Sequence, residues 1–179
     1  VVQRSGQTAK RSIYQSFTMN REETQQVIPH REPMLLVDEA EVADGIATAW
    51  YTIRENEFFT QGHFPGNPIV PGVILCEMMA QGSALLLKDD LDGKLALYAG
   101  IDNVRFKRQV RPGDTVVTRS TITGKKGPLV VVEAEATVDG TMCCKGRLSF
   151  MLTKRPTPTL PTRPPQKSEI FRGPRKGGR

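Results

Sequence analysis

Hydrophobic and polar residues alternate along most of the second half of the chain, as they do in strands that bury one face. The expected strands span residues 94–108, 115–123, 129–138 and 141–152. Short segments that are typical of turns separate them at residues 111–114, 124–128 and 139–140. The pattern therefore predicts an antiparallel meander.

A run of apolar residues without alternation begins at Gly72 and continues to about Lys88. It follows a loop rich in Gly and Pro, residues 62–71, and contains a single acid between Val73 and Leu87, which is Glu77. Apolar residues occupy nearly every face of the helix that this run predicts. We therefore expect a buried helix rather than an amphipathic one, with the core built around it.

The first third of the chain is expected to add a short helix and two strands. Asn20 followed by Glu23 has the spacing of a capping box, which predicts a helix over residues 21–27. The expected strands are residues 34–42 and 45–53, with a turn at residues 44–45. One long helix and many antiparallel strands indicate the α+β class.

The 179 residues, 38% of them hydrophobic, suffice for one globular domain. A net charge of +6 suits a nucleic-acid-binding protein, but residues 154–179 hold eight of the 25 Lys and Arg and one of the 19 Asp and Glu. That leaves 17 basic and 18 acidic residues in the rest of the chain. We therefore expect an N-terminal extension at 1–18, a near-neutral domain at 19–153, a disordered basic tail at 154–179, and no nucleic-acid partner.

Three cysteines, Cys76, Cys143 and Cys144, are a poor basis for a disulfide framework, which favours a reducing, cytoplasmic setting. No segment reaches the ~18 consecutive apolar residues of a membrane span, so we expect a soluble protein. The two histidines and the adjacent cysteine pair lack the spacing of a zinc site, and we expect no metal. Cys76 is interpreted as an inert buried thiol, because no base is evident near it.

Two titratable residues indicate acid–base chemistry. His63 lies in the rigid Gly/Pro loop, and an ordinary imidazole can accept a proton at neutral pH. Glu77 lies in the apolar helix, where burial favours the protonated carboxyl that can act as an acid. The start of the helix at Gly72 supplies free backbone N–H groups that can stabilise a developing oxyanion.

Three blocks of sequence resemble the 3-hydroxyacyl-[acyl-carrier-protein] dehydratases of bacterial type II fatty acid synthesis. They are IPHREPMLLVD at residues 28–38, GHFPGNPIVPGVILCEMMAQ at 62–81, and AGIDNVRF at 99–106 with PGD at 112–114. The resemblance covers roughly residues 20–152. It implies the hotdog fold: a single α+β domain in which an antiparallel sheet wraps around a long central helix.

The resemblance also implies an activity and a shared active site. His63 and Glu77 would be the catalytic pair of a hydro-lyase that converts (3R)-3-hydroxyacyl thioesters on acyl carrier protein to trans-2-enoyl thioesters. The backbone amide at Gly72 would bind the thioester carbonyl. Each site of a homodimer would take its His from one subunit and its acid from the other, and the expected assembly is a trimer of such dimers. No organic cofactor is implied.

Further residues are expected to contact the substrate or its carrier. The expected substrate contacts are Gly72, Phe64, Val73 and Gln81. Gln81 lies one helical turn after Glu77, and we expect a hydrogen bond between them. A weaker prediction is that an acidic acyl carrier protein meets the basic residues Arg105, Lys107, Arg108 and Arg111, which a merely solvated strand would explain as well. His30 is interpreted as structural.

Three alternatives stay open. Dehydratase/isomerases of the same fold have Asp where this chain has Glu77, which favours a plain dehydratase. An acyl thioesterase would accumulate free thiol and free acid instead of an enoyl product. A non-catalytic acyl-binding module, with the tail as a docking peptide, is the third alternative, and the presence of both His63 and Glu77 speaks against it.

Overall fold

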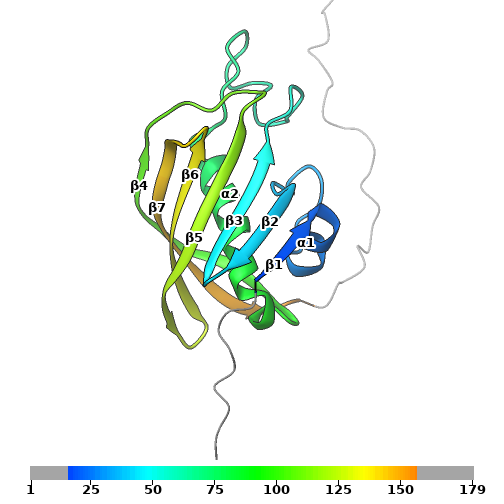
Figure 1. The fold of residues 1–179 in the computed structure, drawn as a ribbon, viewed down its shortest axis with the longest axis vertical. Coiled ribbons are helices and arrows are strands. Elements are labelled where there is room, and N and C mark those ends of the chain that lie inside the picture. The colour runs from blue at the N-terminus through cyan, green and yellow to red at the C-terminus, as the bar shows by residue number, and fades with distance from the viewer. Residues whose placement is uncertain (1–15, 157–179) are drawn as a thin grey trace, which may run out of the picture.

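The computed structural model describes residues 16–156, which form one antiparallel sheet with a long helix, α2, behind it (Figure 1). The strands are β1 (Phe17–Asn20), β2 (Glu39–Ala43), β3 (Ile46–Thr52), β4 (Lys94–Phe106), β5 (Thr115–Lys126), β6 (Leu129–Val138) and β7 (Thr141–Lys154). Their order across the sheet is β1-β2-β3-β5-β6-β7-β4. Most of the predicted N-terminal extension, and the tail from residue 157, lie outside the described residues.

Helix α2 (Gly72–Ala84) packs on the inner face of the sheet, against β3, β5, β6 and β7. Its residues are buried from Leu75 to Ala84 except at Glu77. Gly82 lets the helix approach closely, since a Cβ there would lie 2.7 Å from Thr118 Oγ1 and 3.3 Å from Ala49 Cβ. The predicted arrangement, a sheet around a central helix, is confirmed.

The ends of α2 differ from the prediction. The α-helix stops at Ala84, and a 3-10 helix, η1 (Leu85–Asp90), takes up the rest of the predicted segment. Ser83 Oγ donates to the Met79 carbonyl at 2.6 Å, and such side-chain competition for helix carbonyls disturbs the regular ladder. At the other end Val73 is 71% exposed, so the expectation of burial on nearly every face is wrong for the first turn.

The predicted hairpins are confirmed, with small shifts in strand bounds. Two turns have positive φ at both central positions, 51° and 75° at Asp44 and Gly45, and 50° and 72° at Asp139 and Gly140. This geometry matches the twist of the flanking strands. Strand β5 runs three residues past its predicted end, beyond an irregularity in register between Ile122 and Gly124.

Residues 34–38 were expected to begin a strand and instead form a buried loop. Leu36 N–H donates to Gln81 Oε1, and Gln81 Nε2 donates to the Met34 carbonyl, both at 2.8 Å. Arg21 donates to the carbonyls of Leu35 and Val37 at 2.8 and 2.9 Å. Because side chains satisfy these backbone groups, the sheet does not need to pair them, and β2 begins only at Glu39.

The predicted capping box opens α1 (Arg21–Val27). Asn20 Oδ1 accepts the Glu23 N–H, and Glu23 Oε2 accepts the Asn20 N–H, both at 2.9 Å. The strand just before it, β1, was not predicted, because four residues are too few to show a period. Within residues 16–156, none of the helices combines the length and the apolar character needed to cross a bilayer.

Strand β4 forms one edge of the sheet and pairs only with β7. It is 13 residues long, and most of its residues are exposed. Three of its apolar side chains are about half exposed: Leu97 at 50%, Ile101 at 49% and Phe106 at 55%. A long edge of this kind is rarely left open in native proteins.

Candidate active site

His63 lies in the loop between β3 and α2, which is closed by its own backbone. Phe64 and Asn67 exchange backbone hydrogen bonds of 3.2 and 2.9 Å, and Ile69 N–H donates to the His63 carbonyl at 2.8 Å. From the opposite segment, Arg111 Nη1 donates to Asn67 Oδ1 at 2.7 Å. The loop therefore has one hydrogen-bonded conformation that fixes the direction of the imidazole.

The imidazole of His63 has a defined tautomer. Its Nδ1 atom lies 3.1 Å from the Ile69 carbonyl oxygen, in a hydrogen bond. A carbonyl can only accept, so Nδ1 carries the proton and Nε2 keeps its lone pair. The ring also stacks on Phe64, with centroids 4.1 Å apart. The Nε2 atom makes no hydrogen bond or ion pair with any residue between 16 and 156.

Glu77 extends from α2 and is held on one side of its carboxyl. Gln81 Nε2 donates to Glu77 Oε1 at 2.9 Å, which confirms the predicted hydrogen bond. The Glu77 side chain is 19% exposed, and no hydrogen bond or ion pair within residues 16–156 involves Oε2. One carboxyl oxygen is therefore fixed, while the other is free to meet a ligand.

His30 is a neighbour of Glu77 that sequence reasoning missed. Its Nε2 atom lies 3.2 Å from Glu77 Oε1, and its side chain is 32% exposed. The buried loop that follows His30 folds back over α2 because Gln81 binds the backbone at Met34 and Leu36. No local sequence pattern predicts a contact between residues so far apart in the chain.

The start of α2 has free backbone donors. Its first turn has no side-chain cap, and Ile74 N–H donates to the Pro71 carbonyl at 2.9 Å. The N–H groups of Gly72 and Val73 make no hydrogen bond to another described residue. A Cβ on Gly72 would lie 2.8 Å from Phe106 Cε1, so the glycine is needed for the ring to lie beside this turn.

Comparison with known proteins decides the family. Residues 28–147 match the model of the FabA-like domain. The chain belongs to the FabA-like family. It is 47% identical to the 3-hydroxyacyl-[acyl-carrier-protein] dehydratase FabZ of Lactococcus lactis subsp. cremoris over 139 residues, which are 76% of this chain and 96% of that protein. It is 45% identical to the protein of the same name from Streptococcus pyogenes serotype M5, over 74% of this chain and 97% of that protein.

Solved structures agree on the fold of this FabA-like domain. The dehydratase heterocomplex ApeI:P from Xenorhabdus doucetiae superposes with a TM-score of 0.63 at 20% identity, over 74% of this chain and 91% of that one. The predicted family and the predicted hotdog fold are both confirmed.

The four basic residues predicted to meet a carrier do not form one group in this FabA-like domain. Arg111 binds the His63 loop, and Arg108 donates to the Val138 carbonyl and to Asp114. Arg105 and Lys107 are exposed, and neither pairs with an acid within residues 16–156. Two of the four cations therefore have structural partners, and two face solvent.

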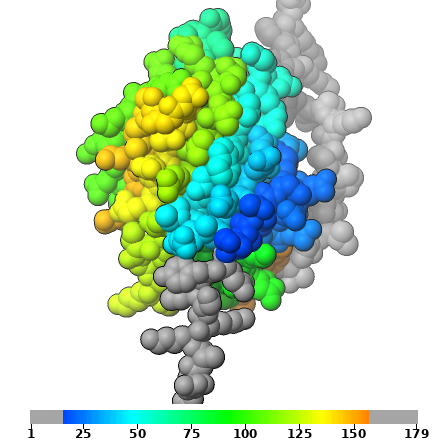
Figure 2. Space-filling model, in the orientation of Figure 1, coloured from blue at the N-terminus to red at the C-terminus, as the bar shows by residue number. Residues whose placement is uncertain are grey.

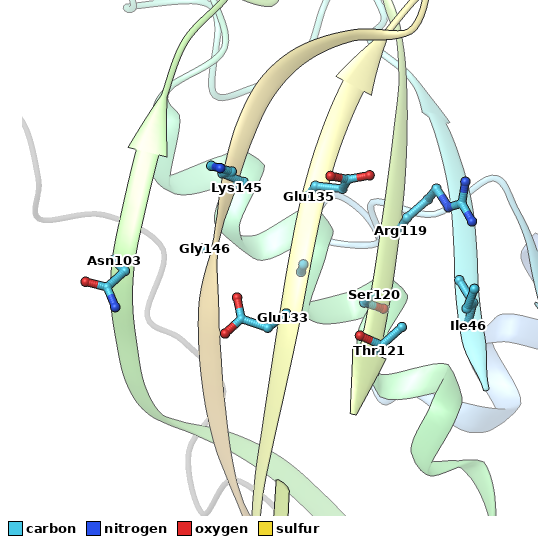
Figure 3. A pocket seen from close by; sticks show the side chains of 10 residues that line it. Ile46, Asn103, Arg119, Ser120, Thr121, Glu133, Glu135, Lys145 and Gly146 are labelled. Atoms are coloured by element: carbon cyan, nitrogen blue, oxygen red, sulfur yellow. The ribbon is translucent and has the colours of Figure 1, made fainter. Parts of the chain in front are cut away.

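The predicted catalytic pair comes from two separate segments: His63 from the loop before α2, and Glu77 from α2 itself. No hydrogen bond or ion pair joins His63 to Glu77 in the part of the chain that the structure describes. The outer face of the sheet is turned toward the viewer in Figure 2. A hollow of about 640 Å³ on this face is lined by Arg119, Glu133, Glu135 and Lys145, among other residues (Figure 3). None of the predicted site residues lines it. Positive and negative side chains alternate from strand to strand in this hollow, so it does not favour a ligand of either charge.

Two titratable side chains near Glu77, those of Tyr98 and Cys76, have shifted pKa values. Tyr98 O–H donates to the Cys76 carbonyl at 2.8 Å, and burial, with the Glu77 charge next, raises the pKa of Tyr98 far above its ordinary value. A hydrogen bond with Cys144 lowers the pKa of Cys76, but the thiol is free and buried. The phenol therefore stays neutral, and the thiol lies away from solvent.

Proposed function

We propose that this chain catalyses the dehydration of (3R)-3-hydroxyacyl thioesters on acyl carrier protein to trans-2-enoyl thioesters, in fatty acid elongation. The observation that carries this proposal is the likeness to curated dehydratases, with 47% identity over 96% of the length of the L. lactis protein. The family match over residues 28–147 includes both His63 and Glu77. The roles below follow from the geometry of those residues.

His63 is the proposed base. Its Nε2 lone pair takes the proton from C2 of the acyl chain, while the Ile69 carbonyl keeps the other proton on Nδ1. The same carbonyl then stabilises the imidazolium that forms, because it accepts from the Nδ1–H. The electrons of the broken C2–H bond move into the thioester carbonyl, which becomes an enolate.

Glu77 is the proposed acid. With Oε1 held by Gln81, the proton sits on Oε2 and passes to the hydroxyl at C3. The C3–O bond breaks, water leaves, and the enolate electrons form the double bond between C2 and C3. The products are the enoyl thioester, water, a carboxylate at Glu77 and an imidazolium at His63. Proton return from His63 to Glu77 through solvent completes the cycle.

The start of α2 is the proposed binding site for the thioester oxygen. The free N–H groups of Gly72 and Val73 point out of the helix end, where the helix dipole also favours negative charge. One donor of this kind is typically worth about 3 kcal/mol of the barrier. The exposed ring of Phe106 beside this turn, and that of Phe64 stacked on His63, would contact the acyl chain.

The active site is proposed to form between two copies of the chain. No hydrogen bond or ion pair joins His63 to Glu77 within residues 16–156, and the chemistry needs them on adjacent carbons of one substrate. The apolar edge strand β4, with Leu97, Ile101 and Phe106 about half exposed, offers the surface for the second copy. Three such dimers would make the expected trimer of dimers.

The carrier protein is proposed to dock at Arg105 and Lys107. Arg105 lies in the edge strand β4, Lys107 directly follows it, and these exposed cations complement an acidic carrier. A cytoplasmic location is proposed with this function, and the three cysteines, all free and buried, fit it.

The proposal is tested by a dehydration assay, or the reverse hydration, on wild type, His63→Ala and Glu77→Gln. Either change should lower kcat by orders of magnitude, while the oligomer measured by light scattering stays intact. Full activity in either variant contradicts the assigned roles. Product analysis tests the activity itself: free thiol would indicate a thioesterase, and a cis-3 product would indicate a dehydratase/isomerase.

A further inference from the structure

His30 is a titratable side chain that the proposed mechanism leaves without a role. Its Nε2 atom lies 3.2 Å from Glu77 Oε1, the same oxygen that accepts the Gln81 N–H at 2.9 Å. Two nitrogen donors from different segments therefore converge on one oxygen of the proposed acid.

The other ring nitrogen of His30 favours one tautomer of the neutral ring. Nδ1 is buried and has no hydrogen-bond partner among residues 16–156. A proton on Nδ1 would be a buried donor without an acceptor, which is costly. A neutral ring with its proton on Nε2, the nitrogen 3.2 Å from Glu77 Oε1, avoids this cost.

Resting on the proposed function, we propose that His30 is a positioning residue: a neutral N–H donor that, together with Gln81, holds Glu77 Oε1 so that Oε2 delivers the proton to the substrate hydroxyl. When Oε2 carries the proton, Oε1 is a carbonyl oxygen whose two lone pairs match the two donors. When the proton leaves, the new carboxylate accepts the same two N–H groups more strongly. Catalytic contacts of this kind commonly tighten when substrate is bound.

A neutral donor suits this step better than a cation. An imidazolium beside Glu77 would favour the carboxylate already in the resting state, which leaves no proton to give. The other charged or titratable groups that face the pair are Arg31, whose Nη1 donates to the His30 carbonyl at 2.7 Å, and Cys76 and Tyr98 near Glu77. None of them places a second cation on Oε1.

The test compares two substitutions of His30. His30→Ala removes the donor and should lower kcat by roughly 10- to 100-fold, with KM nearly unchanged, since a hydrogen bond to a charged group is worth about 1.5–3 kcal/mol. His30→Gln keeps an uncharged N–H donor of similar reach and should restore kcat to within about threefold of wild type. Its pH profile of kcat should superimpose on that of wild type. If His30→Gln is as slow as His30→Ala, or if its profile is displaced, the neutral-donor role is wrong.

A double-variant cycle separates positioning from a general effect on folding. In a Glu77→Gln background, adding His30→Ala should leave the residual rate unchanged, because His30 acts only through Glu77. An equal fall in both backgrounds overturns the inference. Glu32→Gln is the matched control, since Glu32 is in the same loop and 68% exposed, and the new amide oxygen still accepts from its partner Arg21. Its kcat should equal that of wild type.

The same experiments distinguish this inference from the proposed function. If wild type does not dehydrate the thioester, the proposed function fails. If wild type is active and depends on Glu77 while His30→Ala is fully active, only the role of His30 fails. Should His30→Gln not fold, the double-variant cycle with Glu77→Gln still tests the inference, since an equal fall in both backgrounds overturns it.

Discussion

Gln81 holds Glu77 in place: its side-chain Nε2 atom donates to Glu77 Oε1 at 2.9 Å, one helical turn away on α2. The same amide also binds the loop at residues 34–36, through the Met34 carbonyl and the Leu36 N–H, both at 2.8 Å. Gln81 is 1% exposed. A single buried side chain therefore fixes both the proposed acid and the loop that covers it.

Replacing Gln81 with Leu should reduce both stability and activity. The change leaves the Met34 carbonyl and the Leu36 N–H without partners in the core, and each unsatisfied group costs about 1–3 kcal/mol. We expect urea denaturation to show a loss of about 2–4 kcal/mol in the free energy of unfolding, and kcat to fall at least tenfold. Gln26→Leu, on the exposed face of α1, is the control and should change neither quantity. A Gln81→Leu variant as stable as wild type would show that the amide is not needed.

Hybrid dimers should recover activity that neither parent has. If each site takes His63 from one subunit and Glu77 from the other, a mixed dimer of His63→Ala and Glu77→Gln has one complete site and one site that lacks both groups. After subunit exchange, we expect up to about one quarter of the wild-type rate, because half of the dimers are hybrids and each has one working site. Exchange is followed by mass spectrometry of tagged subunits. No recovery despite proven exchange would place both groups in one subunit.

Arg105 and Lys107 should affect the carrier protein rather than the chemistry. Both are exposed and lack acidic partners in residues 16–156, so the double change Arg105→Glu and Lys107→Glu should raise KM for the carrier-bound substrate about tenfold or more. The kcat should not change, and a short synthetic thioester should react as with wild type. Raising the ionic strength should also raise the KM of the wild type, because salt screens the attraction between these cations and the carrier.

Arg111, unlike Arg105 and Lys107, should affect the chemistry and not the binding of the carrier. It binds Asn67 in the loop of His63 with an Nη1–Oδ1 distance of 2.7 Å, so Arg111→Gln should lower kcat for both kinds of substrate. Equal behaviour of the Arg111 variant and the Arg105–Lys107 variant would contradict this division of roles.

Gly82 should be the most sensitive glycine of α2. An added Cβ would lie 2.7 Å from Thr118 Oγ1 and 3.3 Å from Ala49 Cβ, and both neighbours are buried. Gly82→Ala should therefore lower the free energy of unfolding by about 1–3 kcal/mol, measured in urea. Adding Thr118→Ala removes the closer atom and should recover part of this loss. If the double variant is no more stable than the sum of the two single changes predicts, the clash is not the cause.

Much of the fold follows from periodic patterns, and the exceptions have physical causes. Strands β5 to β7 and the capping box of α1 were predicted because alternation and cap spacing are local signals. The apolar residues Leu35 to Val37 suggested a strand, since apolar sequence alone does not tell whether the sheet or side chains will satisfy the backbone. Here Gln81 and Arg21 do so, from distant positions.

Some features of the candidate site could likewise be predicted from the sequence, and others could not. The Gln81–Glu77 hydrogen bond was predictable, because both residues lie on one helix face four positions apart. His30 beside Glu77 was not, because the contact depends on how the loop at 34–38 folds over α2. The tautomer of His63 also needed coordinates, since it depends on the position of the Ile69 carbonyl.

Tyr51 should make the protein less stable in alkaline solution, and Tyr51→Phe should weaken that dependence. The Tyr51 O–H donates to Glu57 Oε1 at 2.6 Å, and both side chains are buried. Burial first, and then Glu57, raise the pKa of Tyr51 in the folded state above its ordinary value. The stabilisation that this difference provides is complete below about pH 10, the pKa of an unfolded Tyr. It is lost as the pH rises from there through the higher pKa of the folded state.

Urea denaturation between pH 8 and pH 11 provides the measurement. At pH 8 the Tyr51→Phe variant should be less stable than wild type by about 1–3 kcal/mol, because it lacks a hydrogen bond to a carboxylate. Above pH 10 its free energy of unfolding should fall less steeply than that of wild type, so the two curves should converge. They should not become flat, because the pKa of Tyr98 is raised as well and contributes in both proteins. Parallel curves across this range would mean that the pKa of Tyr51 is not higher in the folded state than in the unfolded state.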